Sequence, residues 1–185
     1  MKRLTALLLL SVLAATPAVA QIAPSSNAPV DVTADELEVQ NQDCLAIWRG
    51  SAEALQDQSR LRANVLNIYN KRGSGTRSAG PSMGGGNCGA LDRMEADGNV
   101  YYVTPSQVIK GDHAVYMADS RTITVTGDVV ATQGKNVLTG TKLVVNTDTG
   151  QATMVSNVQG RGKSGRVRGV FYPNQGGPGG PAKQP

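Results

Sequence analysis

Few side chains in this 185-residue sequence have the chemistry or the spacing of an active site. The single histidine, His113, lies in an alternating segment without a recognisable partner, whereas a Ser or Cys nucleophile usually needs a nearby base. The carboxylate pairs Glu36/Glu38 and Glu95/Asp97 have the composition of a glycosidase acid–base pair. The two members of each pair are two residues apart, so on a strand they share one face, and a solvated strand surface accounts for them. Because cofactor motifs are also absent, we expect a protein that is not an enzyme, with no catalytic residues and no cofactor.

The N-terminus has the parts of a secretory signal peptide. Lys2 and Arg3 precede an apolar run that begins at Leu4, and the small-residue sequence Ala18-Val19-Ala20 follows. An uncleaved anchor is the alternative, but the apolar run is shorter than the roughly 20 residues that a membrane-spanning helix needs. We therefore predict that residues 1–20 are removed after Ala20 and that the protein is exported.

The two cysteines, Cys44 and Cys88, are the only thiols in the chain. Two thiols and one histidine make a weak metal site, so we predict no metal site. An exported protein meets an oxidising environment, which favours a disulfide between these cysteines over two free thiols.

A Gly- and Ser-rich segment, residues 72–89, interrupts the alternating pattern. Its "GGGNCG" resembles a phosphate-binding glycine loop, but the lysine and the following helix that such a site needs are missing. We interpret the segment as a loop inserted between two strands.

The remaining chain repeats one pattern. Small residues that open similar segments occur at intervals of 29, 48 and 29 residues, at Ala34, Ala63, Gly111 and Gly140. Gly50, Gly98 and Gly127 each stand thirteen residues before one of the last three of these small residues. The long interval is one 29-residue unit enlarged by about 19 residues, which the 72–89 loop supplies.

Each repeat alternates apolar and polar residues, as half-buried strands do. The stretch "ITVTGDVVATQGKNVLTGTKLVV", residues 123–145, has the pattern of a β-hairpin around a turn at "QGKN". The apolar face predicts an interior made of Leu37, Val39, Trp48, Leu66, Ile68, Met94, Val100, Tyr102, Tyr116, Ile123, Val125, Val129, Leu143 and Val145. From the pattern alone, these residues form either a closed core or the wall of a ligand groove.

Repeats that each expose one apolar face must stack to bury it. We therefore predict an all-β fold of stacked antiparallel strands, as two facing sheets or a flattened roll. Such a stack has a first strand near "VDVTADELEV" and a last strand near "GRVRGVFY", whose unpaired backbone groups favour edge-to-edge pairing with other rolls or with copies of the protein.

Several of these segments together resemble the LptA (OstA-like) family of periplasmic lipopolysaccharide-transport proteins. They are "VTADELEV", "GDHAVY", "TGDVVATQGKNVLTGTKLVVNTDTGQATM" and "RVRGVFYP", which follow the export signal in this order. The resemblance covers roughly residues 29–172, within a predicted domain of residues 21–172. The inserted loop, the cysteine pair and the Gly-Pro tail depart from the family pattern.

The resemblance implies a fold and a function. The fold is an open β-jellyroll with an apolar interior groove, and the ligand is lipopolysaccharide, with the acyl chains of lipid A bound by the interior residues. The implied role is a head-to-tail periplasmic bridge from the inner to the outer membrane, with inner-membrane-anchored LptC-like and outer-membrane LptD-like components as partners. A structural β-solenoid or interaction protein with a closed core is the alternative.

Charge is unevenly distributed along the chain. Five basic residues and no acid follow Val158, so the C-terminal part carries +5 while residues 21–158 carry −3. An exported protein seldom meets nucleic acid, so we expect no nucleic-acid partner, and contact with anionic lipid or a solvated tail instead. Residues 173–185 are predicted to be a disordered Gly/Pro tail.

Overall fold

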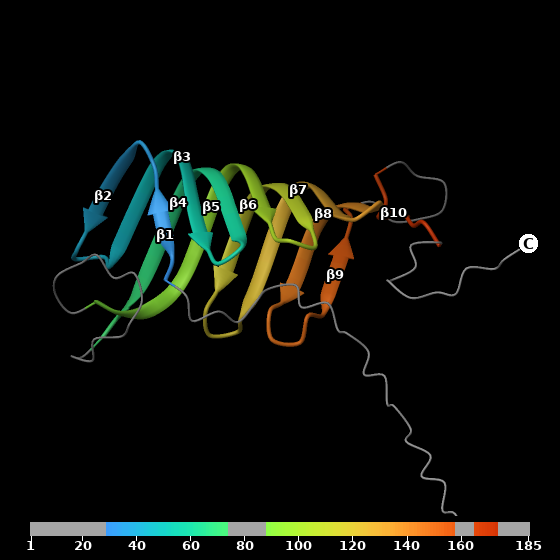
Figure 1. The fold of residues 1–185 in the computed structure, drawn as a ribbon. Coiled ribbons are helices and arrows are strands. Elements are labelled where there is room, and N and C mark those ends of the chain that lie inside the picture. The colour runs from blue at the N-terminus through green and yellow to red at the C-terminus, as the bar shows by residue number, and fades with distance from the viewer. Residues whose placement is uncertain (1–28, 74–87, 158–164, 174–185) are drawn as a thin grey trace, which may run out of the picture.

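The computed structural model describes residues 29–73, 88–157 and 165–173, and these residues form one antiparallel sheet without a helix (Figure 1). The all-β prediction is confirmed. The predicted signal peptide and most of the predicted tail lie outside the described residues. The strands are β1 (Asp31–Thr33), β2 (Glu36–Gln40), β3 (Leu45–Gln56), β4 (Ser59–Arg72), β5 (Cys88–Val103), β6 (Val108–Met117), β7 (Thr122–Gln133), β8 (Asn136–Asn146), β9 (Ala152–Val155) and β10 (Arg168–Val170).

The sheet is a meander in which the long strands β3 to β8 each pair with the next one along the chain. Its two ends are built alike. β1 and β2 pair with the second and first halves of β3, and β10 and β9 pair with the first and second halves of β8. At each end of the sheet, two short strands therefore take the place of one long bent strand. Figure 1 shows the strands side by side along the roll, from β2 in blue to β9 and β10 in orange and red.

The long strands bend near their middles, and the bend folds the sheet into two layers. Layer A contains β2, β9 and the strand halves in register with them; layer B contains β1, β10 and the remaining halves. The ladder register shifts at the bend, as between Arg49 and Ala52 in the β3–β4 pair. Gly50, Gly98 and Gly127 have φ of +82°, +74° and +101° there, a backbone region that favours glycine.

A polar side chain faces each of these glycines from the preceding unit. A Cβ atom added at Gly50 would overlap Asp35, one at Gly98 would overlap Asn64, and one at Gly127 would overlap Asp112. At the last bend, Asp112 Oδ2 accepts a hydrogen bond from the backbone N–H of Asp128 at 3.3 Å. The repeated small-Asp/Asn pattern therefore places a polar group against each bend, and the glycine leaves room for it.

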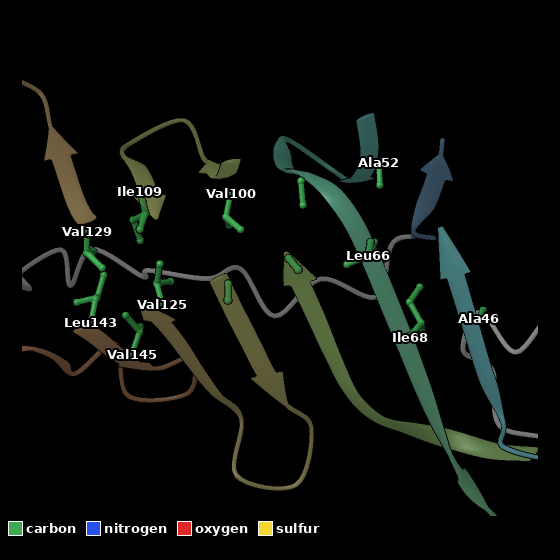
Figure 2. Close-up of a cluster of buried hydrophobic side chains, with 13 residues drawn as sticks. Ala46, Ala52, Leu66, Ile68, Val100, Ile109, Val125, Val129, Leu143 and Val145 are labelled. Carbon is green, nitrogen blue, oxygen red and sulfur yellow. The ribbon is translucent and has the colours of Figure 1, made fainter. Parts of the chain in front are cut away.

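The core lies between the two layers, and Figure 2 shows its side chains pointing inward from both. Leu66, Val100, Val129 and Val145 are each only 1 % exposed. Small residues sit where the layers approach most closely: a Cβ atom at Gly111 would overlap the side chain of Val125. Burial of this apolar surface is the main favourable contribution to the stability of such a fold.

The predicted loop at residues 72–89 is shorter than the sequence suggested at both ends. β4 continues to Arg72, β5 begins at Cys88, and these two residues are register partners. Antiparallel pairing thus extends into the Gly-rich segment, because the ladder requires only backbone groups and not apolar periodicity. Residues 74–87 lie outside the described part of the chain. Among the described residues, no helix is long and apolar enough to cross a membrane.

Candidate functional site

Continuous apolar rows cross the inner face of the sheet from one edge to the other. Within each layer, the antiparallel register places one inward residue of each strand beside that of the next strand. In layer A, one row consists of Leu37, Trp48, Leu66, Ala96, Ala114, Val125, Leu143 and Met154. In layer B, a row consists of Val32, Ala54, Leu61, Tyr102, Ile109, Ala131, Leu138 and Gly169.

Part of the space between the two layers is an open groove of about 480 Å³, lined by β1 and by β3 to β7. Its wall is mostly apolar and includes Ile68 and Ile123 from layer A and Leu61 and Ile109 from layer B. Polar residues occur where strands end: Gln56 and Ser59 in layer B, and Arg121, Thr147 and Asp148 in layer A. The groove is therefore suited to a ligand with a long apolar part and a polar end.

The structure brings most of the predicted interior residues together. Eight line the groove: Leu66, Ile68, Met94, Val100, Tyr102, Tyr116, Ile123 and Val125. Five pack in or against the buried cluster away from the groove wall: Leu37, Trp48, Val129, Leu143 and Val145. Val39 is the exception. It is 38 % exposed, because it lies on the edge strand β2, which pairs only with β3.

Several groove residues were not predicted. Val32, Leu61, Ile109 and Ala114 line the groove as well. Leu61 and Ile109 each stand two residues before a small residue of the repeat, Ala63 or Gly111. Extending the period-two pattern backward from those positions would have identified both.

Ion pairs join neighbouring turns at the layer A end of the groove. Arg121 Nη1 lies 2.8 Å from Asp148 Oδ1, and this carboxylate raises the pKa of Arg121. The Arg121 carbonyl accepts hydrogen bonds from the backbone N–H of Thr147 at 2.8 Å and from its hydroxyl at 3.0 Å. Lys71 pairs in the same way with Asp119. These side chains are exposed, so each pair contributes little to stability.

Two hydroxyl groups interrupt the apolar wall in layer B. Burial raises the pKa of the Tyr102 phenol, and its neighbour Ser59 partly opposes that rise. The two hydroxyls do not meet hydrogen-bond geometry, and the buried Ser59 Oγ has no hydrogen-bond partner in the protein. Trp48 Nε1 is likewise buried and without a partner, but Trp48 does not line the groove.

The groups considered for catalysis lie on the outer face. His113 does have a partner, contrary to the prediction: its Nδ1 is 2.5 Å from Asp97 Oδ1 on the adjacent strand. Both side chains are more than a third exposed. Glu95 is paired with Arg93 at 2.7 Å and Glu38 with Arg49 at 2.7 Å. Surface ion pairing therefore accounts for Glu38, Glu95 and Asp97.

The predicted disulfide between Cys44 and Cys88 is present. Cys44 precedes β3 and Cys88 begins β5, and their Cα atoms are 5.4 Å apart. The bond links two strands that are separated by β4 in the sheet, at the end of the roll beside the Gly-rich segment. Among the described residues, no group of His, Cys, Asp and Glu has a metal-binding arrangement.

An unclosed antiparallel roll with an apolar groove between its two layers is the architecture of an open β-jellyroll. The family model of the LptA/(LptD N-terminal domain) LPS transport protein matches residues 31–166. The chain belongs to this LPS transport family.

Two further similarities agree with this assignment. The chain is 29 % identical over 131 residues to an uncharacterized protein of Rhizobium meliloti (strain 1021), a match that spans 70 % of this chain and 67 % of that protein. Its fold is similar to the crystal structure of LptH, the LptA homologous periplasmic component of the lipopolysaccharide transport device from Pseudomonas aeruginosa. That match has a TM-score of 0.61 at 17 % identity and covers 79 % of this chain and 96 % of LptH.

Proposed function

We propose that this protein carries lipopolysaccharide across the periplasm by holding the acyl chains of lipid A in the groove between layers A and B. The observation that carries the proposal is an open groove with an apolar wall and polar residues at its ends. Acyl chains gain about 25 cal/mol for each Å² of apolar surface removed from water, whereas a sugar-phosphate head group stays hydrated. Membership of the LPS transport family supports the same ligand.

The two open edges of the sheet support a role as a bridge. Among the residues that the structure describes, the β1/β2 edge and the β9/β10 edge each pair on one side only, which leaves backbone groups for pairing with another roll. The apolar rows reach both edges, with Leu37 and Val32 at one and Met154 and Gly169 at the other. Pairing with LptC-like and LptD-like rolls, or with copies of this chain, would join the grooves into one shielded path between the membranes.

Export to the periplasm is part of the same proposal. Residues 1–20 have the pattern of a signal peptide that is cleaved after Ala20. The Cys44–Cys88 disulfide suits an oxidising compartment.

Trp48 provides a direct test, because it is the only tryptophan in the chain and it is the register partner of Leu66, which lines the groove. Gently purified protein should carry acylated glycolipid detectable by mass spectrometry. Lipopolysaccharide with bromine-labelled acyl chains should quench Trp48 fluorescence, and unlabelled lipopolysaccharide should not. A structural protein with a closed core would show neither effect, and that result would refute the carrier proposal.

A further inference from the structure

The groove wall is not uniformly apolar, and one of its polar side chains, that of Ser59, is buried without a hydrogen bond to the protein. Ser59 is only 8 % exposed, and its Oγ has no hydrogen-bond partner in the protein. A buried hydroxyl without a partner is destabilising, and most buried polar side chains in folded proteins do find one. Ser59 belongs to the strand positions that face inward, together with Leu61 and Ala63, so its hydroxyl borders the groove.

Tyr102 adds a second hydroxyl at the same place. It is the register partner of Leu61 on the neighbouring strand, and it lines the groove together with Ser59. The nearby Thr104 hydroxyl differs, because it accepts a hydrogen bond from the backbone N–H of Gln107 at 3.2 Å and so stabilises a turn. Ser59 Oγ makes no comparable bond.

The position of this pair along the groove indicates which part of a ligand would reach it. Ser59 is paired with Gln56 at the β3–β4 turn, where the layer B strands end. It also borders an outer hollow lined by Arg60 and Arg62, which are held by Glu53 at 3.0 and 3.3 Å. Beyond Ser59, the wall becomes apolar. A chain whose polar end stays at the strand ends would therefore pass Ser59 with the carbons nearest that polar end.

We propose that Ser59 and Tyr102 form a hydrogen-bonding subsite for a hydroxyl group carried by an acyl chain close to its polar end. A hydroxyl suits both partners, since it donates and accepts. An unsubstituted chain fills the same apolar wall but leaves Ser59 Oγ unpaired. The groove thus prefers hydroxylated acyl chains. This inference rests on the proposed function, which places acyl chains in the groove.

The test compares two probes that differ by one hydroxyl, dodecanoate and 3-hydroxydodecanoate, each displacing an uncharged fluorescent apolar probe from the full chain. The wild-type protein should bind the hydroxy acid about three- to tenfold more tightly, the effect of one net hydrogen bond. Ser59→Ala should lose most of this preference, because the variant has no hydroxyl at position 59 to pair with that of the hydroxy acid. Tyr102→Phe should lose part of the preference. Ser106→Ala, on the exposed turn at the same end of the layer, is the matched control and should keep it.

The outcomes separate this inference from the proposed function. If the wild-type protein binds both acids equally, or Ser59→Ala keeps the full preference, the hydroxyl subsite is wrong and the carrier function stands. If the wild-type protein binds neither acid, the proposed function fails and this inference fails with it. Circular dichroism and the thermal midpoint of each variant establish that the comparison is made between folded proteins.

Discussion

A carboxylate placed on the groove wall should abolish loading of an apolar ligand without unfolding the protein. Ile123 is the suitable position, because it lines the groove but is only partly buried. In the empty protein, Asp at position 123 remains in contact with water in the groove. The variant Ile123→Asp should therefore lose only the burial of one aliphatic side chain, about 1–2 kcal/mol of unfolding free energy.

The cost appears when an acyl chain displaces that water. An ionised carboxylate in an apolar site is so unfavourable that the group takes up a proton instead. At pH 7, protonating a carboxyl with an ordinary pKa of about 3.9 costs about 4 kcal/mol, which corresponds to a loss of affinity of about a thousandfold. Bound ligand raises the pKa of the introduced carboxyl. Affinity should consequently recover about tenfold for each pH unit as the pH falls from 7 towards about 4, and then level off.

Displacement of an uncharged fluorescent probe, measured across this pH range, gives the affinity directly. Thr126→Asp is the matched control, because Thr126 lies on the outer face between His113 and Lys142 on the adjoining strands. It should bind the probe like the wild-type protein at every pH. Equal affinities for the two variants at pH 7, or a loss in Ile123→Asp that does not depend on pH, would refute the groove assignment.

Three further predictions concern stability and assembly. Gly127→Ala should lower the free energy of unfolding in urea by about 2–3 kcal/mol, because the backbone there has φ of +101° and the added Cβ overlaps the facing aspartate. Gly73→Ala is the control and should cost far less, because a Cβ atom there makes only ordinary contacts. Similar costs for the two variants would contradict the role assigned to the bend glycine. Titration of the unfolded, unreduced protein should find no free thiol, and two reactive thiols would disprove the disulfide. Replacing both Cys44 and Cys88 by Ala should lower the free energy of unfolding by about 2–4 kcal/mol. Light scattering should show the wild-type mass rising with concentration, while Val32→Pro, which disrupts the β1 edge, stays monomeric. A wild-type protein that is monomeric at every concentration would rule out edge pairing between copies of this chain.

Local pattern was sufficient to predict the strands and most of their inward faces. The period-two alternation identified the inner face, and the "QGKN" turn was placed correctly, with β7 ending at Gln133 and β8 beginning at Asn136. These features depend on neighbouring residues along one chain segment, so the sequence contains them directly. The cysteine pair was also predictable in kind, because an export signal and two cysteines suggest a disulfide before any geometry is known.

The period-two alternation does not determine how the two layers pack against each other. Val129 and Ile123 have the same inward direction and similar chemistry, yet Val129 is 1 % exposed at the bend while Ile123 lines the open groove. Distance from the bend does not decide this, because Val100 also follows a bend glycine by two residues and is 1 % exposed, yet it lines the groove. The groove is lined by β1 and by β3 to β7, and no residue of β8 contributes to its wall. The uncovered Val39 and the unpaired hydroxyl of Ser59 follow from the same three-dimensional arrangement. Which apolar residues form core and which form a binding wall is thus decided by tertiary packing, since it depends on contacts between residues far apart in the chain.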